Sequence, residues 1–152
     1  MKIKTDRLLI VPCTVESYNA FSDKYQMGPH IEMHLEELKN DIKSIGWGVW
    51  FVIHCDSNLV IGDVGFKGKP NDQKTVEIGY GINSDYQNNG FATEAVNGIK
   101  DWALSSNQVN KIVAECAEEN VASIRVLEKI GMSQTYSKDG FIYWENPQRV
   151  DS

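Results

Sequence analysis

The sequence predicts a mixed α+β fold of three layers, in which helices cover both faces of one central sheet. Three observations support this prediction. The first half of the chain carries strand-like segments separated by short polar turns, which is typical of antiparallel pairing. The second half alternates strand, helix, strand and helix, an order that produces a parallel crossover connection. The 152 residues are 41% hydrophobic and 24% charged, values typical of one globular domain over residues 1–152.

Composition also limits the classes of function. A formal net charge of −6 at pH 7 disfavours a nucleic-acid partner, because a phosphate-binding surface needs an excess of lysine and arginine. No apolar run approaches the ~20 residues of a membrane helix, and residues 1–7 do not resemble a signal peptide. Three cysteines without CxxC spacing suit reduced thiols. We therefore expect a cytoplasmic protein whose partners include neither a nucleic acid nor a membrane.

The chain is expected to begin with one strand over residues 3–11. Thr14 can cap a short helix over residues 15–24, because its hydroxyl can accept a hydrogen bond from an unpaired backbone N–H group. Pro29 opens a second helical stretch over residues 31–45, in which apolar residues recur at helical spacing.

A hairpin follows, since the strand-like residues 49–55 and 59–67 flank the turn sequence Asp-Ser-Asn at residues 56–58. A polar loop then leads to a strand over residues 75–82. After a second polar loop the apolar spacing becomes helical and continues to about residue 104, which predicts the first helix of the second half.

The rest of the chain repeats the alternation and closes with a hairpin. Residues 111–117 are expected to form a strand parallel to the preceding one, and residues 120–130 a helix. Gly131 stands where a left-handed residue ends many helices. Residues 132–137 and 141–145 form the last predicted strands.

The loop after residues 75–82 has the pattern of an anion site. Gly90 stands at its end, where a helix begins, and the first amides of a helix lack intrahelical partners while the helix dipole adds positive charge. Small Ala92 would not crowd a phosphate. No lysine or arginine lies between Ile82 and Ile99, so backbone dipoles and amide side chains would hold the anion. Spacing alone leaves an ordinary tight turn as the alternative.

Two segments, in order, resemble the signatures of the GNAT superfamily of N-acetyltransferases. Residues 87–92, Gln-Asn-Asn-Gly-Phe-Ala, are similar to its Q/R-x-x-G-x-G/A signature, and residues 119–132 look like its second signature. Residues 5–10, Thr-Asp-Arg-Leu-Leu-Ile, resemble the start of the branch that contains ribosomal-protein alanine N-acetyltransferases. The resemblance covers essentially the whole chain. It implies the GNAT fold and an N-acetyltransferase whose co-substrate is acetyl-coenzyme A (acetyl-CoA).

The resemblance also implies where acetyl-CoA binds. In this family two parallel strands splay into a V, and the pantetheine arm pairs with the exposed edge of the first strand. The pyrophosphate would bind the loop and the first amides of the helix, and a second helix would reach the cofactor through an asparagine and a small polar residue. The expected contacts are Tyr80, Gly81, Ile82, Gln87, Asn88, Asn89, Gly90, Phe91, Ala92, Thr93, Asn120 and Ser123.

Acetyl transfer requires an amine that loses a proton, a polarised thioester carbonyl and a neutralised thiolate. A backbone N–H group near Gly81 could polarise the carbonyl. For the base, the resemblance implies Glu115, which lies five residues before Asn120, and Glu77 on the other strand is its rival. For each glutamate, a solvated or ion-paired strand residue is the competing interpretation.

Two further features bear on the site. Many relatives carry a tyrosine seven residues after the asparagine as general acid, whereas this chain has Leu127. Ser123 or a water is then expected to protonate the sulfur, unless the thiolate leaves unassisted. His30 and His34 are spaced i, i+4 but lack the glutamate of a zinc-protease motif, so we expect no metal site. They lie where the resembled family varies its acceptor pocket, which implies an acceptor contact, and a solvated helix face is the competing interpretation.

Three functions remain open at this point. The leading prediction is direct acetyl transfer, in a ternary complex, to the primary amine of a protein N-terminus or a small molecule. The alternatives are a catalytically idle sensor that binds coenzyme A and a domain that binds a protein through an exposed strand edge. Either a monomer or a homodimer fits the sequence.

Overall fold

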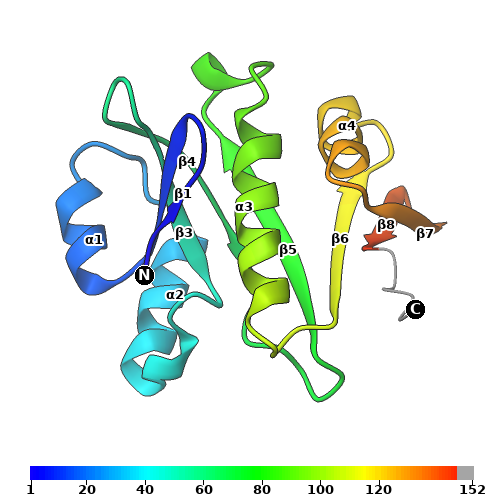
Figure 1. Ribbon diagram of the computed structural model, residues 1–152, viewed down its shortest axis with the longest axis horizontal. Coiled ribbons are helices and arrows are strands. Elements are labelled where there is room, and N and C mark those ends of the chain that lie inside the picture. The colour runs from blue at the N-terminus through cyan, green and yellow to red at the C-terminus, as the bar shows by residue number, and fades with distance from the viewer. Residues whose placement is uncertain (147–152) are drawn as a thin grey trace.

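A mixed sheet of eight strands runs through residues 1–146, the part of the chain that the computed structural model describes (Figure 1). Residues 147–152 of the predicted domain lie outside it. The sheet order is β1-β2-β3-β4-β5-β6-β8-β7, and the β5–β6 pair is parallel while the other neighbours are antiparallel. The strands are β1 (Ile3–Lys4), β2 (Leu8–Pro12), β3 (Val49–His54), β4 (Leu59–Phe66), β5 (Thr75–Ile82), β6 (Lys111–Ala117), β7 (Ser133–Lys138) and β8 (Phe141–Glu145).

Helices cover both faces of the sheet, which confirms the predicted three-layer α+β fold. Side chains of a strand alternate between its faces. Phe51 of β3 accordingly packs in the cluster beneath the first two helices, whereas Trp50 and Val52 pack in the larger cluster beneath the last two. No described helix is both long and apolar enough to span a bilayer. The helices are α1 (Val15–Phe21), α2 (Pro29–Asn40), α3 (Phe91–Ser105) and α4 (Val121–Lys129), with single 3-10 turns at Ile42–Ser44 and Ser84–Tyr86.

Local chemistry sets several of the predicted boundaries. The Thr14 hydroxyl accepts a hydrogen bond from the backbone N–H group of Ser17 at 3.1 Å and caps α1, as predicted. Gly131 has φ of +85°, the left-handed conformation expected after α4. Strands β5 and β6 have the predicted bounds, and α3 connects them as a parallel crossover.

The start of the chain differs from the prediction of one strand over residues 3–11. Strands β1 and β2 form a hairpin instead, because the turn between them wraps around Glu94 of α3. The carboxylate of Glu94 accepts a hydrogen bond from the hydroxyl of Thr5. It also accepts two from Arg7, one from the backbone N–H group at 2.9 Å and one from Nε at 2.7 Å. Arg7 and Glu94 are 87 positions apart, so the local pattern carries no sign of this turn.

Helix α2 also ends earlier than the prediction of residue 45. Its last residue is Asn40, and Asp41 adopts an extended conformation with φ of −151°. The carboxylate of Asp41 accepts a hydrogen bond from the backbone N–H group of Lys43 at 3.0 Å. This contact stabilises the 3-10 turn Ile42–Ser44 in place of a last α-helical turn.

The two parallel strands separate along their length. Strands β5 and β6 are paired only from Thr75 to Glu77 and from Lys111 to Val113. Beyond these residues β5 pairs with β4 and β6 pairs with β8. Figure 1 shows β5 (green) and β6 (yellow) diverging along their length. They are farthest apart at the end of the sheet where α3 begins and where α4 lies. The splayed V that the resemblance implied is therefore present.

Candidate active site

The backbone of β5 presents unpaired groups inside the V. The carbonyl of Glu77 accepts a hydrogen bond from the N–H group of Lys67, and the N–H group of Asn83 donates to the carbonyl of Ile61. Because strand residues alternate, odd-numbered residues at this end of β5 direct their backbone groups toward β4. Tyr80 therefore directs its N–H and C=O groups toward the gap on the β6 side, where an extended ligand could pair with them.

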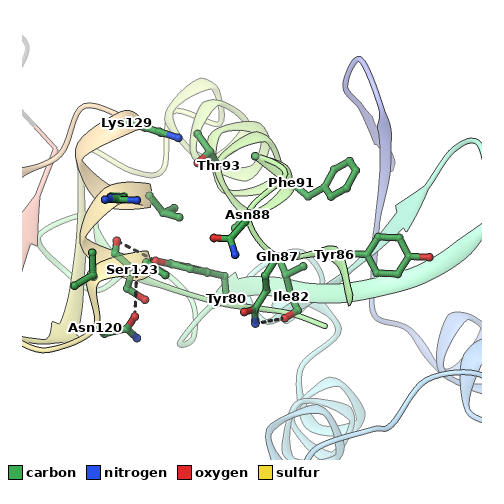
Figure 2. Close-up of a pocket in the computed structure, with 17 residues that line it drawn as sticks. Tyr80, Ile82, Tyr86, Gln87, Asn88, Phe91, Thr93, Asn120, Ser123 and Lys129 are labelled. Carbon is green, nitrogen blue, oxygen red and sulfur yellow. Dashed lines mark hydrogen bonds between the residues drawn. The ribbon is translucent and has the colours of Figure 1, made fainter. Parts of the chain in front are cut away.

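A cleft of about 720 Å³ occupies the V (Figure 2). It is bounded by the end of β5, the following loop, the start of α3 and α4. Of the predicted cofactor contacts, Asn89 does not line it, because the carbonyl of Asn89 accepts from Arg7 Nη1 at 2.8 Å and its side chain donates to the carbonyl of Gln87 at 3.0 Å. The predicted residues that line it are Tyr80, Gly81, Ile82, Gln87, Asn88, Gly90, Phe91, Ala92, Thr93, Asn120 and Ser123.

The beginning of α3 is open toward the cleft. Gly90 is its N-cap residue and has φ of +80°, a conformation that side chains disfavour. Within the described residues no side chain caps this end, so the first amides of α3 keep no intrahelical partner. Phe91, Ala92 and Thr93 line the cleft at this end, and the binding of an anion by their amides stays a prediction.

Arg7 contacts this loop and the start of α3 but does not line the cleft. Its guanidinium lies 4.2 Å from the ring centroid of Phe91 and forms an ion pair with Glu94, with 2.7 Å between Nε and Oε1. Burial acts to raise the pKa of Glu94, but hydrogen bonds from Thr5 and Arg7 outweigh it and lower that pKa. The charge of Glu94 in the first turn of α3 is therefore matched by Arg7, which limits its repulsion of an anion.

Positive charge in the cleft comes from α4, which the sequence reasoning missed. Arg125 and Lys129 line the cleft, and Figure 2 shows Lys129 on the opposite side from Thr93 at the start of α3. The loop between Ile82 and Ile99 carries no lysine or arginine, and from this loop alone no salt bridge to a phosphate was expected. The i, i+4 spacing of the two cations on the helix that Asn120 caps was the available signal, since such residues share one helix face.

The start of α4 is tied to β5 across the V. The Asn120 side-chain carbonyl accepts a hydrogen bond from the Ser123 N–H group at 3.1 Å and so caps α4. The Tyr80 phenol donates to the carbonyl of Ser123 at 3.4 Å (Figure 2). Burial raises the pKa of Tyr80, which keeps the phenol protonated as a donor. Leu127 is 1% exposed and belongs to the core, whereas two tyrosines, Tyr80 of β5 and Tyr86, line the cleft.

A second cleft of about 520 Å³ opens on the other face of β5, beneath α2. Its lining includes Asp63, Lys67 and the backbone of Gly79. Among the described residues, the two clefts have Tyr80 and Gly81 in common. One ligand in each cleft would therefore meet the other at the backbone of these two residues.

Both histidines singled out from the sequence line this second cleft. His30 Nε2 lies 2.8 Å from Asp63 Oδ1, and the Tyr25 hydroxyl donates to Asp63 Oδ2 at 2.6 Å. Burial, together with Asp63, raises the pKa of Tyr25. His34 is 4% exposed and packs against Gly48. Within residues 1–146, no group of three or more His, Cys, Asp or Glu side chains is placed to hold a metal ion.

The two glutamates considered as bases lie outside both clefts. Lys67 Nζ is 2.5 Å from Glu77 Oε2 and 3.9 Å from Glu115 Oε1, so one lysine bridges the two parallel strands through these carboxylates. The competing interpretation of ion-paired strand residues describes both side chains in this structure. A catalytic role for either glutamate stays a prediction.

The sequence is similar to known acetyltransferases. A family model described as "Acetyltransferase (GNAT) domain" matches residues 7–133. The uncharacterized N-acetyltransferase YnaD of Bacillus subtilis is 33% identical over 141 residues, which cover 87% of this chain and 82% of YnaD. The uncharacterized N-acetyltransferase YjdG of the same species is 30% identical over 99 residues, which cover 65% of this chain but only 59% of YjdG. The chain thus spans less than two thirds of some relatives.

Solved structures share the fold over nearly the whole chain. A GNAT-family acetyltransferase from Bacillus anthracis superposes with a TM-score of 0.70 at 26% identity, covering 95% of this chain and 97% of the other. The ribosomal-protein-S5-alanine acetyltransferase from Vibrio fischeri superposes with a TM-score of 0.73 at 16% identity, covering 97% of each chain. The second likeness concerns the fold alone.

Proposed function

The chain belongs to the GNAT acetyltransferase family, and we propose that it transfers the acetyl group of acetyl-CoA directly to a primary amine while both substrates are bound. The observation that carries this proposal is the meeting of two clefts at Tyr80 and Gly81. A cofactor in the V and an acceptor beneath α2 would bring thioester and amine together there. Holding two reactants in this way replaces a bimolecular encounter with a favourably oriented reaction.

Acetyl-CoA fits the larger cleft in one direction. Its pyrophosphate would accept hydrogen bonds from the amides of Phe91 to Thr93, and Arg125 and Lys129 would supply the opposing charge. Its pantetheine amides would pair with the N–H and C=O groups of Tyr80, much as a neighbouring strand would. The thioester would then reach the place where the two clefts meet.

The reaction would proceed by attack of the neutral amine on the thioester carbonyl. A bond forms between the amine nitrogen and the acetyl carbon, and the C–S bond breaks. The displaced sulfur receives a proton from Ser123 or a water, and the proton that the nitrogen loses on becoming an amide replaces it. The ammonium must first lose a proton, for which Glu115 and Glu77 stay the predicted bases. A backbone N–H group near Gly81 would stabilise the developing oxyanion, and the strand alternation favours that of Tyr80 or Ile82 over that of Gly81.

The thermal unfolding midpoint with and without acetyl-CoA tests the cofactor site. At a hundred times the dissociation constant, a ligand bound only to the folded state adds ~2.7 kcal/mol of stability. Gly90→Glu should abolish the shift, because it places a carboxylate at the anion site. Gly131→Glu is the matched control, since Gly131 also has positive φ but does not line the cleft. A folded wild-type protein that shows no shift would refute the proposal.

Release of the coenzyme A thiol then tests transfer. A panel containing a peptide with a free N-terminus and a polyamine should give turnover with at least one amine. A clear acetyl-CoA shift without thiol release would favour the idle sensor instead. The engagement of Glu77 and Glu115 by Lys67 is the observation that keeps that second function in view.

A further inference from the structure

Asp63 is a charged residue of the second cleft that the proposed function leaves without a role. It lies on β4 directly opposite Gly81 of β5. The backbone alternation makes these two residues a hydrogen-bonded pair, whose Cα atoms are ~5.5 Å apart in antiparallel sheets. The side chain of Asp63 lines the second cleft and is 14% exposed. A carboxylate therefore lies beside the position at which the two clefts meet.

The charge of Asp63 has no permanent counter-ion among the described residues. Its oxygens are hydrogen-bonded to the Tyr25 hydroxyl at 2.6 Å and to His30 Nε2 at 2.8 Å. Lys67, which lines the same cleft, is paired with Glu77 and Glu115 instead. A largely buried carboxylate that lacks a lysine or arginine partner is costly, and a cationic ligand would offset that cost.

The cleft leaves room for such a ligand beside Asp63. A Cβ atom added at Gly81 would have no neighbour within 4 Å among the described atoms, and one added at Gly79 would be 3.8 Å from Lys67 Cε. Gly65, on β4, also lines the cleft, but the backbone of Gly48 already fills the space where its Cβ atom would lie. The open floor is therefore the backbone of Gly79 and Gly81, onto which a small cationic group can descend next to the carboxylate.

We propose that Asp63 binds the acceptor in its ammonium form and holds the acceptor nitrogen beside Gly81, while Tyr25 and His30 fix the carboxylate. This inference rests on the proposed function, and it assigns the acceptor's charge to a residue other than the glutamates considered as bases. It also predicts a preference for primary amines over alcohols, because an ammonium supplies both the positive charge and several N–H donors.

Amine binding can be tested without turnover. The probes are 2-phenylethylamine and 2-phenylethanol, which differ by an ammonium in place of a hydroxyl group, added to the protein saturated with coenzyme A, which carries no acetyl group. The amine should raise the unfolding midpoint of the wild type and the alcohol should not. Asp63→Asn should weaken amine binding ~30-fold or more, because it leaves the ammonium without its buried counter-charge. Tyr25→Phe should weaken it ~5-fold through loss of one hydrogen bond.

Controls separate this inference from the proposed function. Asp101→Asn makes the same charge change at an exposed residue of α3 and should bind the amine like the wild type. Asp63→Asn should keep the full midpoint shift with coenzyme A alone, which shows that it folds. Failure of coenzyme A to stabilise even the wild type would refute the proposed cofactor site. With that shift intact, equal binding of the amine to Asp63→Asn and wild type, equal effects of amine and alcohol, or no amine effect on the wild type would each overturn the role of Asp63.

Discussion

At the scale of single residues, glycines of adjacent strands serve different physical purposes. A Cβ atom on Gly62 would lie 2.3 Å from the carbonyl oxygen of Gly81, so Gly62 is required by close packing of two backbones. A Cβ atom on Gly81 would have no neighbour within 4 Å among the described atoms. Gly81 is therefore free to change as far as the fold is concerned, although it lines both clefts.

Substitution of Gly81 by alanine should separate folding from transfer. We expect Gly81→Ala to keep the wild-type unfolding midpoint and to lower kcat/KM ~10²-fold. The added methyl group would displace the reacting groups by ~1 Å, and a misplacement of that size can lower the rate ~10²-fold. Gly79, two residues earlier on the same face, lines only the second cleft, so Gly79→Ala should lower kcat/KM less. Midpoints from thermal unfolding and rates of thiol release measure the two effects. Unchanged turnover in Gly81→Ala would show that the groups meet elsewhere.

The buried imidazole of His34 makes the stability of the folded protein depend on pH in the acid range. Neither ring nitrogen has a hydrogen-bond partner among the described residues, and burial lowers the pKa of the imidazole below 6.5, although Glu37 offsets part of this effect. The unfolded chain then binds the proton more readily than the folded one. The resulting stability is fully present above pH 6.5 and is lost as the pH falls through the folded pKa.

Replacement of His34 by phenylalanine should reduce this dependence on pH. Between pH 8 and pH 5 the unfolding midpoint of His34→Phe should fall less than that of the wild type. Comparison of the two proteins at pH 8, where the ring is neutral in both states, isolates the packing effect of the substitution. Parallel midpoints across the whole range would contradict the assignment.

At the scale of elements, the cap of α4 combines stability with binding. Asn120 caps the helix through Ser123 and also lines the cofactor cleft. Asn120→Ala should lower the free energy of unfolding by ~1 kcal/mol, whereas Asn120→Asp should keep the cap. The aspartate adds negative charge near the expected phosphates, so it should weaken acetyl-CoA binding more than the alanine does. Thr14→Ala removes the cap of α1 at similar cost and should leave acetyl-CoA binding unchanged. Urea unfolding and the acetyl-CoA midpoint shift measure both effects.

Elements governed by local chemistry could be predicted from the sequence. Strands β5 and β6 have the predicted bounds, and α3 begins directly after Gly90 as predicted, because period, glycine and turn residues all act over a few positions. The hairpin of β1 and β2 could not be predicted, since it depends on Glu94 from a distant helix. The end of α2 depends on the side chain of Asp41, which the apolar period of residues 31–45 does not register.

The same division applies to the site. The residues of the loop and the start of α3 are contiguous, so a single motif predicted them. Asp63 and His30 are 33 positions apart, and Lys67, which directly follows β4, meets Glu77 and Glu115. These contacts arise only when strands take their places in the sheet. The acceptor side was for this reason much less predictable than the cofactor side.

At the scale of the whole molecule, the splayed sheet predicts a pattern of hydrogen exchange. The Tyr80 amide faces the V and should exchange quickly in the free protein, whereas the Gly81 amide is bonded to β4 and should exchange slowly. Acetyl-CoA should slow exchange at Tyr80 at least ~10-fold and leave Gly81 nearly unchanged. Amide exchange followed by NMR, with and without the ligand, checks this. Equal protection of both amides would indicate general stabilisation without pairing at the strand edge.

The narrow overlap of the two clefts bears on how such a protein can diversify. Among the described residues, Tyr80 and Gly81 alone line both clefts, and every other lining residue belongs to one cleft. Mutations in α2 or on the acceptor face of β4 can therefore explore new amines while the donor machinery is inherited intact. Duplicated copies of the gene can diverge in the amine that their products acetylate while they keep the proposed acetyl-CoA site unchanged. The two shared positions are where a single mutation has to satisfy both partners at once.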